Sequence, residues 1–173
     1  MEEIALPDGR RAQLWTGGAT SAPAVLVCHG TPDTRWIART GASAAASAGV
    51  RLVCVNRPGY GTSTPTDSTM SSVADDTVVV LDRLGVDRVA VLGMSVGGAY
   101  AAALAARHPN RVASLAVVAA PRETRTAMGP PDAEAERARP EFAQSFRNRV
   151  VFLDDRHSLI RARPRSGRRL HRP

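Results

Sequence analysis

The sequence predicts an α/β fold built on a mostly parallel, doubly wound sheet. Short apolar runs rich in β-branched residues alternate with segments of helical spacing, and this alternation is typical of βαβ units with right-handed crossovers. The runs are nearly continuous rather than alternating in polarity, as expected of parallel strands that are covered on both faces. Three of the runs also end in a glycine-containing turn, which marks where each strand stops.

The predicted elements follow one another closely over the first 120 residues. An antiparallel hairpin comes first, with Ile4 to Leu6 and Arg11 to Trp15 on either side of the turn Pro7-Asp8-Gly9. The apolar runs that follow predict strands at residues 24–28, 50–55, 89–92 and 112–119. The alanine-rich or helically spaced segments predict helices at residues 36–48, 72–84 and 96–107.

Local signals mark the ends of these helices. Gly49 and Gly85 follow the first two helices, and glycine is common just past a helix C-terminus. His108-Pro109 stops the third, because proline cannot continue a helix. Ser72 and Asp75, three residues apart, resemble a capping box at the start of the second helix.

Length and composition predict a soluble globular protein in the cytoplasm. The 173 residues suffice for a buried core, and no apolar run approaches the roughly 18 residues of a membrane span. The amino terminus is acidic at Glu2 and Glu3, and no apolar signal segment follows. Cys28 and Cys54 each lie inside an apolar run, which predicts buried, reduced thiols.

The net charge of +7 is concentrated near the carboxyl terminus. All 23 basic residues are arginine, and residues 161–173 contain six of them and no acid. Such a tail could be an arm for nucleic acid or another anionic surface, a disordered end, or the product of a shifted reading frame in GC-rich DNA. Its arginine, proline, glycine and serine content favours the last two interpretations over nucleic-acid binding.

The segment Val89 to Tyr100 carries the strongest functional signal. It joins a strand, the motif Gly93-Met94-Ser95-Val96-Gly97 and an alanine-rich helix, which is the context of a nucleophile elbow. The turn is so sharp that Gly93 and Gly97, two residues from the serine on each side, must be nearly free of side chains. The pattern therefore predicts Ser95 as a nucleophile at the carboxyl end of the sheet.

Two further turns complete a resemblance to a known family. His29-Gly30-Thr31-Pro32 follows the run at 24–28, and Asn56-Arg57-Pro58-Gly59-Tyr60-Gly61 follows the run at 50–55. With the Ser95 motif, these turns resemble the amino-terminal half of an α/β-hydrolase, closest to the proline-iminopeptidase-like and esterase-like bacterial group. The resemblance covers about residues 10 to 120.

The resemblance implies a serine hydrolase that cleaves a small-molecule ester or amide through an acyl-enzyme at Ser95. The backbone N–H groups of Thr31 and Val96 would then stabilise the oxyanion. His29, Gly30 and Met94, with the two glycines of the Ser95 motif, would shape the elbow and the oxyanion turn. The Arg57 loop would shape the rim of the site without a chemical role of its own.

A serine nucleophile needs a base, and the base needs an acid to orient it. The family order is nucleophile, acid, histidine. Of the four histidines, His29 and His108 have structural positions and His171 lies in the arginine-rich tail, which leaves His157 as the candidate base. Glu123, which follows the sixth strand, is the candidate acid.

Two interpretations of the activity stay open on the sequence. One is a working serine hydrolase; the other is a catalytically silent, truncated or frame-shifted fragment that lacks the acid and the histidine. The later strands of the family are not visible after residue 120, and roughly 40 residues are too few for them. A sheet that ends there leaves residues 114–119 as an open apolar edge and predicts self-association through it.

The expected organisation has three parts. Residues 1–120 form a partial hydrolase core, residues 121–160 are the start of a helical cap or a remnant, and residues 161–173 are a disordered tail. Residues 132–138 and 141–152 have helical spacing, although the apolar end Val150-Val151-Phe152-Leu153 could form a short strand.

Cofactor and metal motifs are absent from the sequence. It contains no Cys-x-x-Cys, no His-x-x-x-His and no Gly-x-x-x-x-Gly-Lys, and no strand is followed by Gly-x-Gly-x-x-Gly. We therefore expect no metal and no cofactor, and a small-molecule substrate rather than a membrane or nucleic acid as the partner.

Overall fold

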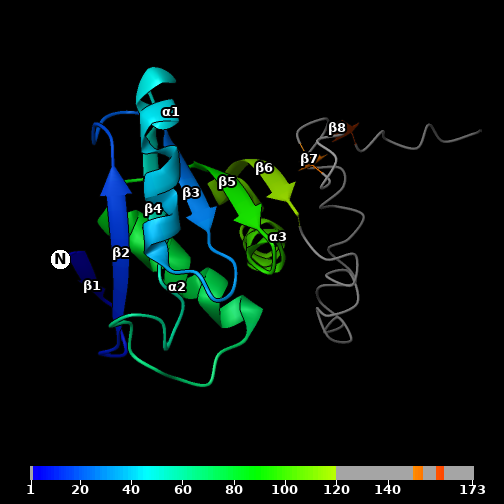
Figure 1. Cartoon of the computed structure of the whole chain (residues 1–173). Coiled ribbons are helices and arrows are strands. Elements are labelled where there is room, and N and C mark those ends of the chain that lie inside the picture. Colours follow the sequence, from blue (N-terminus) through cyan, green and yellow to red (C-terminus); the bar gives the residue numbers. More distant parts are fainter. Residues whose placement is uncertain (1, 120–149, 154–158, 162–173) are drawn as a thin grey trace, which may run out of the picture.

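The computed structural model describes residues 2–119, 150–153 and 159–161 (Figure 1). These residues form one eight-stranded sheet in the order β1-β2-β4-β3-β5-β6-β7-β8. The strands from β4 to β7 in this order are parallel, whereas β1, β2 and β8 pair antiparallel with their neighbours. The strands are β1 (Glu2–Ala5), β2 (Arg11–Gly17), β3 (Ala24–Cys28), β4 (Arg51–Val55), β5 (Val89–Met94), β6 (Val112–Val118), β7 (Val150–Leu153) and β8 (Leu159–Arg161).

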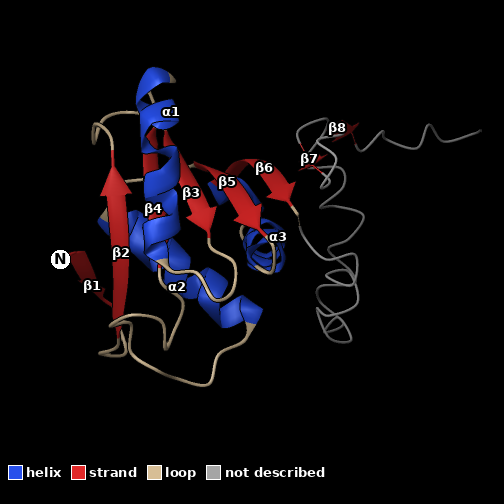
Figure 2. Ribbon diagram, in the orientation of Figure 1, coloured by secondary structure: helices blue, strands red, loops and turns tan. Residues whose placement is uncertain are grey.

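Helices cover both faces of this sheet (Figure 2). One face packs against the short 3-10 helix η1 (Arg35–Gly41) and α1 (Ala42–Ser47). The other face packs against α2 (Met70–Arg83) and α3 (Gly97–Arg107), and the 3-10 turn η2 (Pro109–Arg111) leads into β6. A mostly parallel sheet between two helical layers confirms the predicted fold class.

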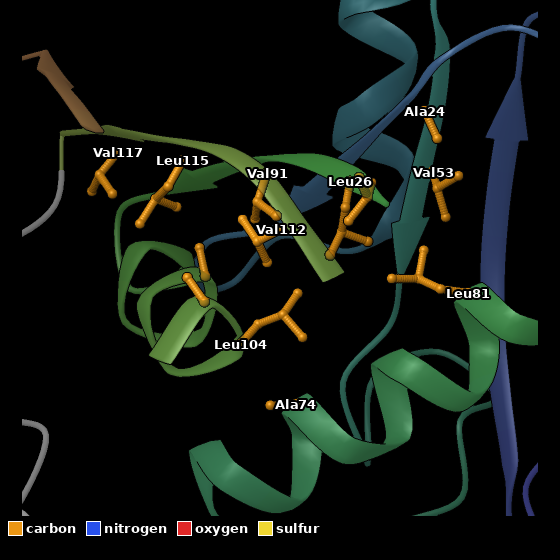
Figure 3. Packing of buried hydrophobic residues seen from close by; sticks show 13 residues of the cluster. Ala24, Leu26, Val53, Ala74, Leu81, Val91, Leu104, Val112, Leu115 and Val117 are labelled. Atoms are coloured by element: carbon orange, nitrogen blue, oxygen red, sulfur yellow. The ribbon is translucent and has the colours of Figure 1, made fainter. Parts of the chain in front are cut away.

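The main core lies between the sheet and the α2–α3 layer (Figure 3). Leu81 of α2 and Leu104 of α3 pack against strand residues such as Val53, and all three side chains are almost fully buried. On β4 the next residue, Cys54, belongs to the opposite cluster under η1 and α1. Consecutive buried residues that serve two cores explain why the strand sequences are continuously apolar.

Both cysteines are free thiols inside the sheet. Burial raises the pKa of Cys28 and of Cys54 to about 12, so both remain protonated near neutral pH. They therefore act as small apolar packing residues.

The predicted helix at residues 36–48 consists of two kinds of helix. Residues 35–41 form η1, with Thr34 as the N-cap, and only the alanine-rich residues 42–47 are α-helical. The alanines have the highest helix propensity, whereas the first half contains β-branched Ile37 and Thr40 and then Gly41. The segment was correctly predicted as helical, but its first half is 3-10 rather than α.

The capping box of α2 lies three residues earlier than the sequence analysis placed it. The Thr69 hydroxyl accepts a hydrogen bond from the Ser72 N–H at 3.0 Å, and the Ser72 hydroxyl accepts one from the Thr69 N–H at 2.9 Å. Thr69 is therefore the N-cap and Ser72 the third helical residue, so the pairing of Ser72 with Asp75 was wrong. Asp75 instead contacts Arg107 and His108 at the far end of α3.

Replacing Thr69 by alanine should lower the free energy of unfolding by about 1 kcal/mol, because it leaves a helix N–H without its acceptor. Urea unfolding measures the difference. Ser68→Ala is the matched control, since Ser68 is exposed one position outside the cap, and should change stability by less than about 0.5 kcal/mol. Equal effects of the two substitutions would contradict the cap.

The strand β6 is not the last strand of the sheet. Val150–Leu153 pairs with it in parallel, from Leu115↔Val150 to Val118↔Leu153, and β8 pairs antiparallel with β7. The expectation of an open apolar edge at 114–119 was therefore wrong, because a run of four apolar residues covers it. The helical assignment of 141–152 was also wrong for residues 150–152, where the strand alternative is confirmed. The rest of that segment and residues 132–138 lie outside the described residues.

Candidate active site

Ser95 directly follows β5, and only the N-cap residue Val96 separates it from α3. Its φ of 52° is in the left-handed region, which a residue with a side chain seldom adopts. The Ser95 N–H donates to the Val118 carbonyl at the end of β6, at 3.0 Å. The half-buried serine is thus held in a strained conformation by the neighbouring strand, as is common at functional sites.

Close backbone contacts explain why glycines flank the serine. A Cβ on Gly93 would lie 2.6 Å from the Gly98 Cα, and one on Gly97 would overlap the carbonyl oxygens of Cys28 and His29. The atom nearest to each added Cβ belongs to the backbone, which cannot move aside as a flexible side chain could. The glycines let α3 begin directly against the end of β3.

The turn after β3 lies against the serine. A Cβ on Gly30 would lie 3.3 Å from the Ser95 Cβ, so the missing side chain of Gly30 leaves room beside Ser95. In the part of the chain that the structure describes, no acceptor takes a hydrogen bond from the N–H of Thr31 or of Val96. Among the described residues, both predicted oxyanion donors are therefore uncommitted: Val96 follows Ser95 in the chain, and Thr31 follows Gly30, which lies against Ser95. Met94 packs into the core under η1 and α1.

His29 is fully buried, and both of its ring nitrogens are occupied. Nδ1 is 2.8 Å from the Gly30 carbonyl oxygen, and Nε2 lies 3.3 Å from the Arg57 N–H. The first contact requires a proton on Nδ1 and the second a lone pair on Nε2, so the ring is neutral with Nδ1 protonated. Burial, and then the charge of Arg57, lowers the pKa of His29 to about 4. His29 thus shapes the turn and cannot serve as the base for Ser95.

The low pKa of His29 predicts that the protein loses stability in acid. A histidine pKa of about 6.5 in the unfolded chain and about 4 in the fold means that the unfolded chain binds more protons between these values. The stabilisation that comes from keeping His29 neutral is complete above pH 6.5. The free energy of unfolding therefore falls by about 3 kcal/mol as the pH falls to 4. Urea unfolding at pH 7 and pH 4 measures the loss, which His29→Asn should largely remove. An NMR titration that gives His29 a pKa near 6.5 would contradict the prediction.

Arg57 is a buried residue to which the sequence analysis gave no chemical role. Its guanidinium donates from Nη1 to the His29 carbonyl, and from Nη2 to the Gly30 carbonyl at 2.9 Å and to the Thr31 hydroxyl at 3.2 Å. The guanidinium also lies 4.7 Å from the ring centre of Tyr60. The only signal in the sequence was an arginine two residues after an apolar strand, and this signal does not identify the partners of its side chain.

A second buried network ties the neighbouring loop to β2. The Gln13 side-chain oxygen accepts hydrogen bonds from Arg35 Nη1 at 2.6 Å, Asn56 Nδ2 at 2.9 Å and the Thr62 N–H at 3.0 Å. The Asn56 Oδ1 in turn accepts from the Arg35 N–H at 2.6 Å. This network joins β2 to η1 and to the residues that follow β4.

The family model for the alpha/beta hydrolase fold matches residues 23–164. The chain belongs to the α/β-hydrolase family. The match continues past residue 120, where the resemblance was expected to end, and so includes both β7 and β8.

The chain is similar to several hydrolase-family proteins. It is 33% identical over 109 residues to an epoxide hydrolase of Caballeronia sordidicola, across 61% of this chain and 33% of the relative. It is 35% identical to a homoserine O-acetyltransferase of Haloferax volcanii, across 66% of this chain and 36% of that protein. A Vigna radiata epoxide hydrolase mutant of known structure has a TM-score of 0.61 at 27% identity, covering 69% of this chain and 39% of the other. The chain spans about a third of the length of the curated relatives it matches.

The structure does not test the predicted acid and base. His157 and Glu123 both lie outside the described residues. His108 is at the C-terminal end of α3, roughly 16 Å from the elbow along the helix, and its Nε2 is 2.8 Å from the Asp75 carboxylate. Thus neither His29 nor His108, the two histidines of the described part, can take a proton from Ser95.

Two further features can be stated for the described residues alone. They contain no group of three or more histidine, cysteine, aspartate or glutamate side chains placed to hold a metal ion. None of their helices combines the length and the apolar character that crossing a membrane requires.

Proposed function

We propose that this α/β-hydrolase cleaves an ester or amide of a small molecule through an acyl-enzyme at Ser95. The observation that carries the proposal is the left-handed Ser95 against Gly30, with the neighbouring N–H groups of Thr31 and Val96 uncommitted among the described residues. A tetrahedral intermediate needs a nucleophile and, close to it, preorganised donors for the negative oxygen. Ser95, Thr31 and Val96 would supply these parts.

The reaction has two halves, acylation of Ser95 and hydrolysis of the acyl-enzyme. In the first, Ser95 Oγ bonds to the substrate carbonyl carbon, the carbonyl oxygen becomes negative, and the N–H groups of Thr31 and Val96 donate to it. The bond to the alcohol or amine then breaks, and the leaving group takes the proton that the base removed from Ser95. In the second half, the base takes a proton from water as the water oxygen bonds to the acyl carbon; the bond from that carbon to Ser95 Oγ then breaks, the carboxylic acid leaves, and the proton passes to Oγ. We assign the base to His157 and the orienting acid to Glu123.

A serine nucleophile favours acyl transfer over the opening of an epoxide. A serine oxygen that opens an epoxide forms an ether, which has no carbonyl for water to attack, so the enzyme would be trapped after one turnover. An acyl group on the same oxygen is an ester, which water can hydrolyse. The name of the Haloferax volcanii relative, an O-acetyltransferase, agrees with acyl chemistry, although another relative is named an epoxide hydrolase.

Trapping the intermediate tests the proposal. The protein is mixed with p-nitrophenyl acetate, quenched in acid and digested, and the peptide that contains Ser95 is examined by mass spectrometry. We expect an acetyl group on Ser95 and release of p-nitrophenolate. Turnover of styrene oxide without any acyl group on Ser95 would contradict the proposal, and so would a protein that neither acylates nor turns over either compound. The latter result would establish the silent fragment.

A further inference from the structure

We infer that Arg57 is a positioning residue that orients the peptide between Gly30 and Thr31, so that its N–H faces the oxyanion. The inference rests on the proposed function, because it concerns the same oxyanion. It assigns a role to a residue that neither the motif at Ser95 nor the turn at His29 explains.

Two donors fix the Gly30 carbonyl oxygen. Arg57 Nη2 lies 2.9 Å from it, and His29 Nδ1 lies 2.8 Å from it on the same buried side. The other arm of the guanidinium donates to the His29 carbonyl, so two consecutive carbonyl groups point towards Arg57. The planar fork of an arginine suits such a pair of acceptors, which a lysine ammonium cannot match.

The direction of this carbonyl determines the direction of the Thr31 N–H. The carbonyl of Gly30 and the N–H of Thr31 belong to one peptide plane, and in a trans peptide they point in opposite directions. Only the next bond, Thr31–Pro32, is cis among the described residues. A carbonyl that points towards Arg57 therefore turns the Thr31 N–H away from it. Glycine at position 30 offers little resistance to rotation of this plane, so an external clamp is needed.

The surroundings of Arg57 direct its charge onto these carbonyls. The residue is only 8% exposed. Tyr60 and Tyr100 each place a ring centre 4.7 Å from the guanidinium carbon. No carboxylate of the described residues lies within salt-bridge distance of it. A buried cation without a carboxylate partner relies on carbonyl dipoles and aromatic faces for its stabilisation, and here most of the dipoles belong to the oxyanion turn.

Arg35 provides a matched control. It is also 8% exposed, stacks on an aromatic ring at 4.4 Å and donates to a buried side-chain oxygen, but its partner is Gln13 rather than the oxyanion turn. Arg57→Gln and Arg35→Gln should therefore cost similar stability. Only the first removes a donor from the Gly30 carbonyl.

Steady-state hydrolysis of p-nitrophenyl acetate by the full chain tests the inference. We expect Arg57→Gln to lower kcat by about 10²- to 10³-fold, the effect of losing one oxyanion donor, with KM changed less than about threefold. Arg57→Lys should recover part of the loss, whereas Arg35→Gln should keep kcat within about threefold of the wild type. Equal losses of kcat in the two glutamine variants would overturn the inference, as would a raised KM with an unchanged kcat.

A structural measurement keeps the inference testable without turnover. In folded Arg57→Gln, the NMR signals of the Gly30 carbonyl and the Thr31 amide should broaden or split, because the peptide samples two orientations. In Arg35→Gln they should stay single. Single, sharp signals in both variants would overturn the inference. This outcome can be distinguished from a failure of the proposed function. In that case Ser95 of the wild type would not become acylated, but the NMR spectra of Arg57→Gln and Arg35→Gln would still differ.

Discussion

Replacing Ser95 by alanine should abolish acylation and lower kcat for p-nitrophenyl acetate by about 10⁶-fold, the loss seen when the nucleophile is removed from a complete triad. The size of the effect follows from covalent chemistry: without Oγ no acyl-enzyme forms, and the oxyanion donors alone provide only about 10³- to 10⁴-fold over water. The measurement is the initial rate together with the mass of the Ser95 peptide. Ser47→Ala, an exposed serine on α1, is the control and should keep the wild-type rate.

The same experiment separates the working enzyme from the silent fragment. In a complete triad, His157→Ala should cost about as much as Ser95→Ala, and the double variant should be no worse than either single one. In a fragment without base and acid, the wild-type rate is already low, Ser95→Ala lowers it only modestly and His157→Ala has no effect. His108→Ala should leave the rate unchanged in both cases, because its partner is Asp75 at the far end of α3.

The elements that carry local signals were predictable from the sequence. Ser95 and its two glycines are adjacent in the chain, and their strand and helix have distinct compositions, so the elbow could be placed without tertiary information. The strands and helices before residue 120 follow for the same reason, since each has its own periodicity and end signal. The N-cap of α2 was misplaced because threonine and serine occupy positions 68, 69, 71 and 72, and only geometry selects Thr69.

Contacts between distant segments were not predictable. Arg57 acts on a turn 26 to 28 residues away in the chain, and nothing in its own neighbourhood specifies that turn. The pairing of β7 with β6 likewise joins residues on either side of the undescribed segment 120–149. A periodicity argument cannot distinguish a short apolar run that ends a helix from one that adds a strand, because both bury the same residues.

Among substitutions that add a single methyl group at the site, Gly97→Ala should lower the free energy of unfolding the most. The new Cβ would overlap the carbonyl oxygens of Cys28 and His29, which belong to β3 and the start of the oxyanion turn. Neither oxygen can move without displacing β3 or the turn that follows it. We therefore expect the free energy of unfolding to fall by about 3 kcal/mol, at the upper end of overpacking effects.

The same substitution should also lower kcat, because the strain is relieved only by moving α3 away from the oxyanion turn. Urea unfolding gives the stability, and ester hydrolysis under conditions where the variant is folded gives the rate. Gly41→Ala is the control: Gly41 has an ordinary φ of −91°, and its added Cβ would meet only the Leu52 Cδ1 at 3.5 Å. It should change stability by less than about 0.5 kcal/mol. If Gly97→Ala were as mild as Gly41→Ala, the close approach of α3 to β3, and with it the geometry of the elbow described above, would be wrong.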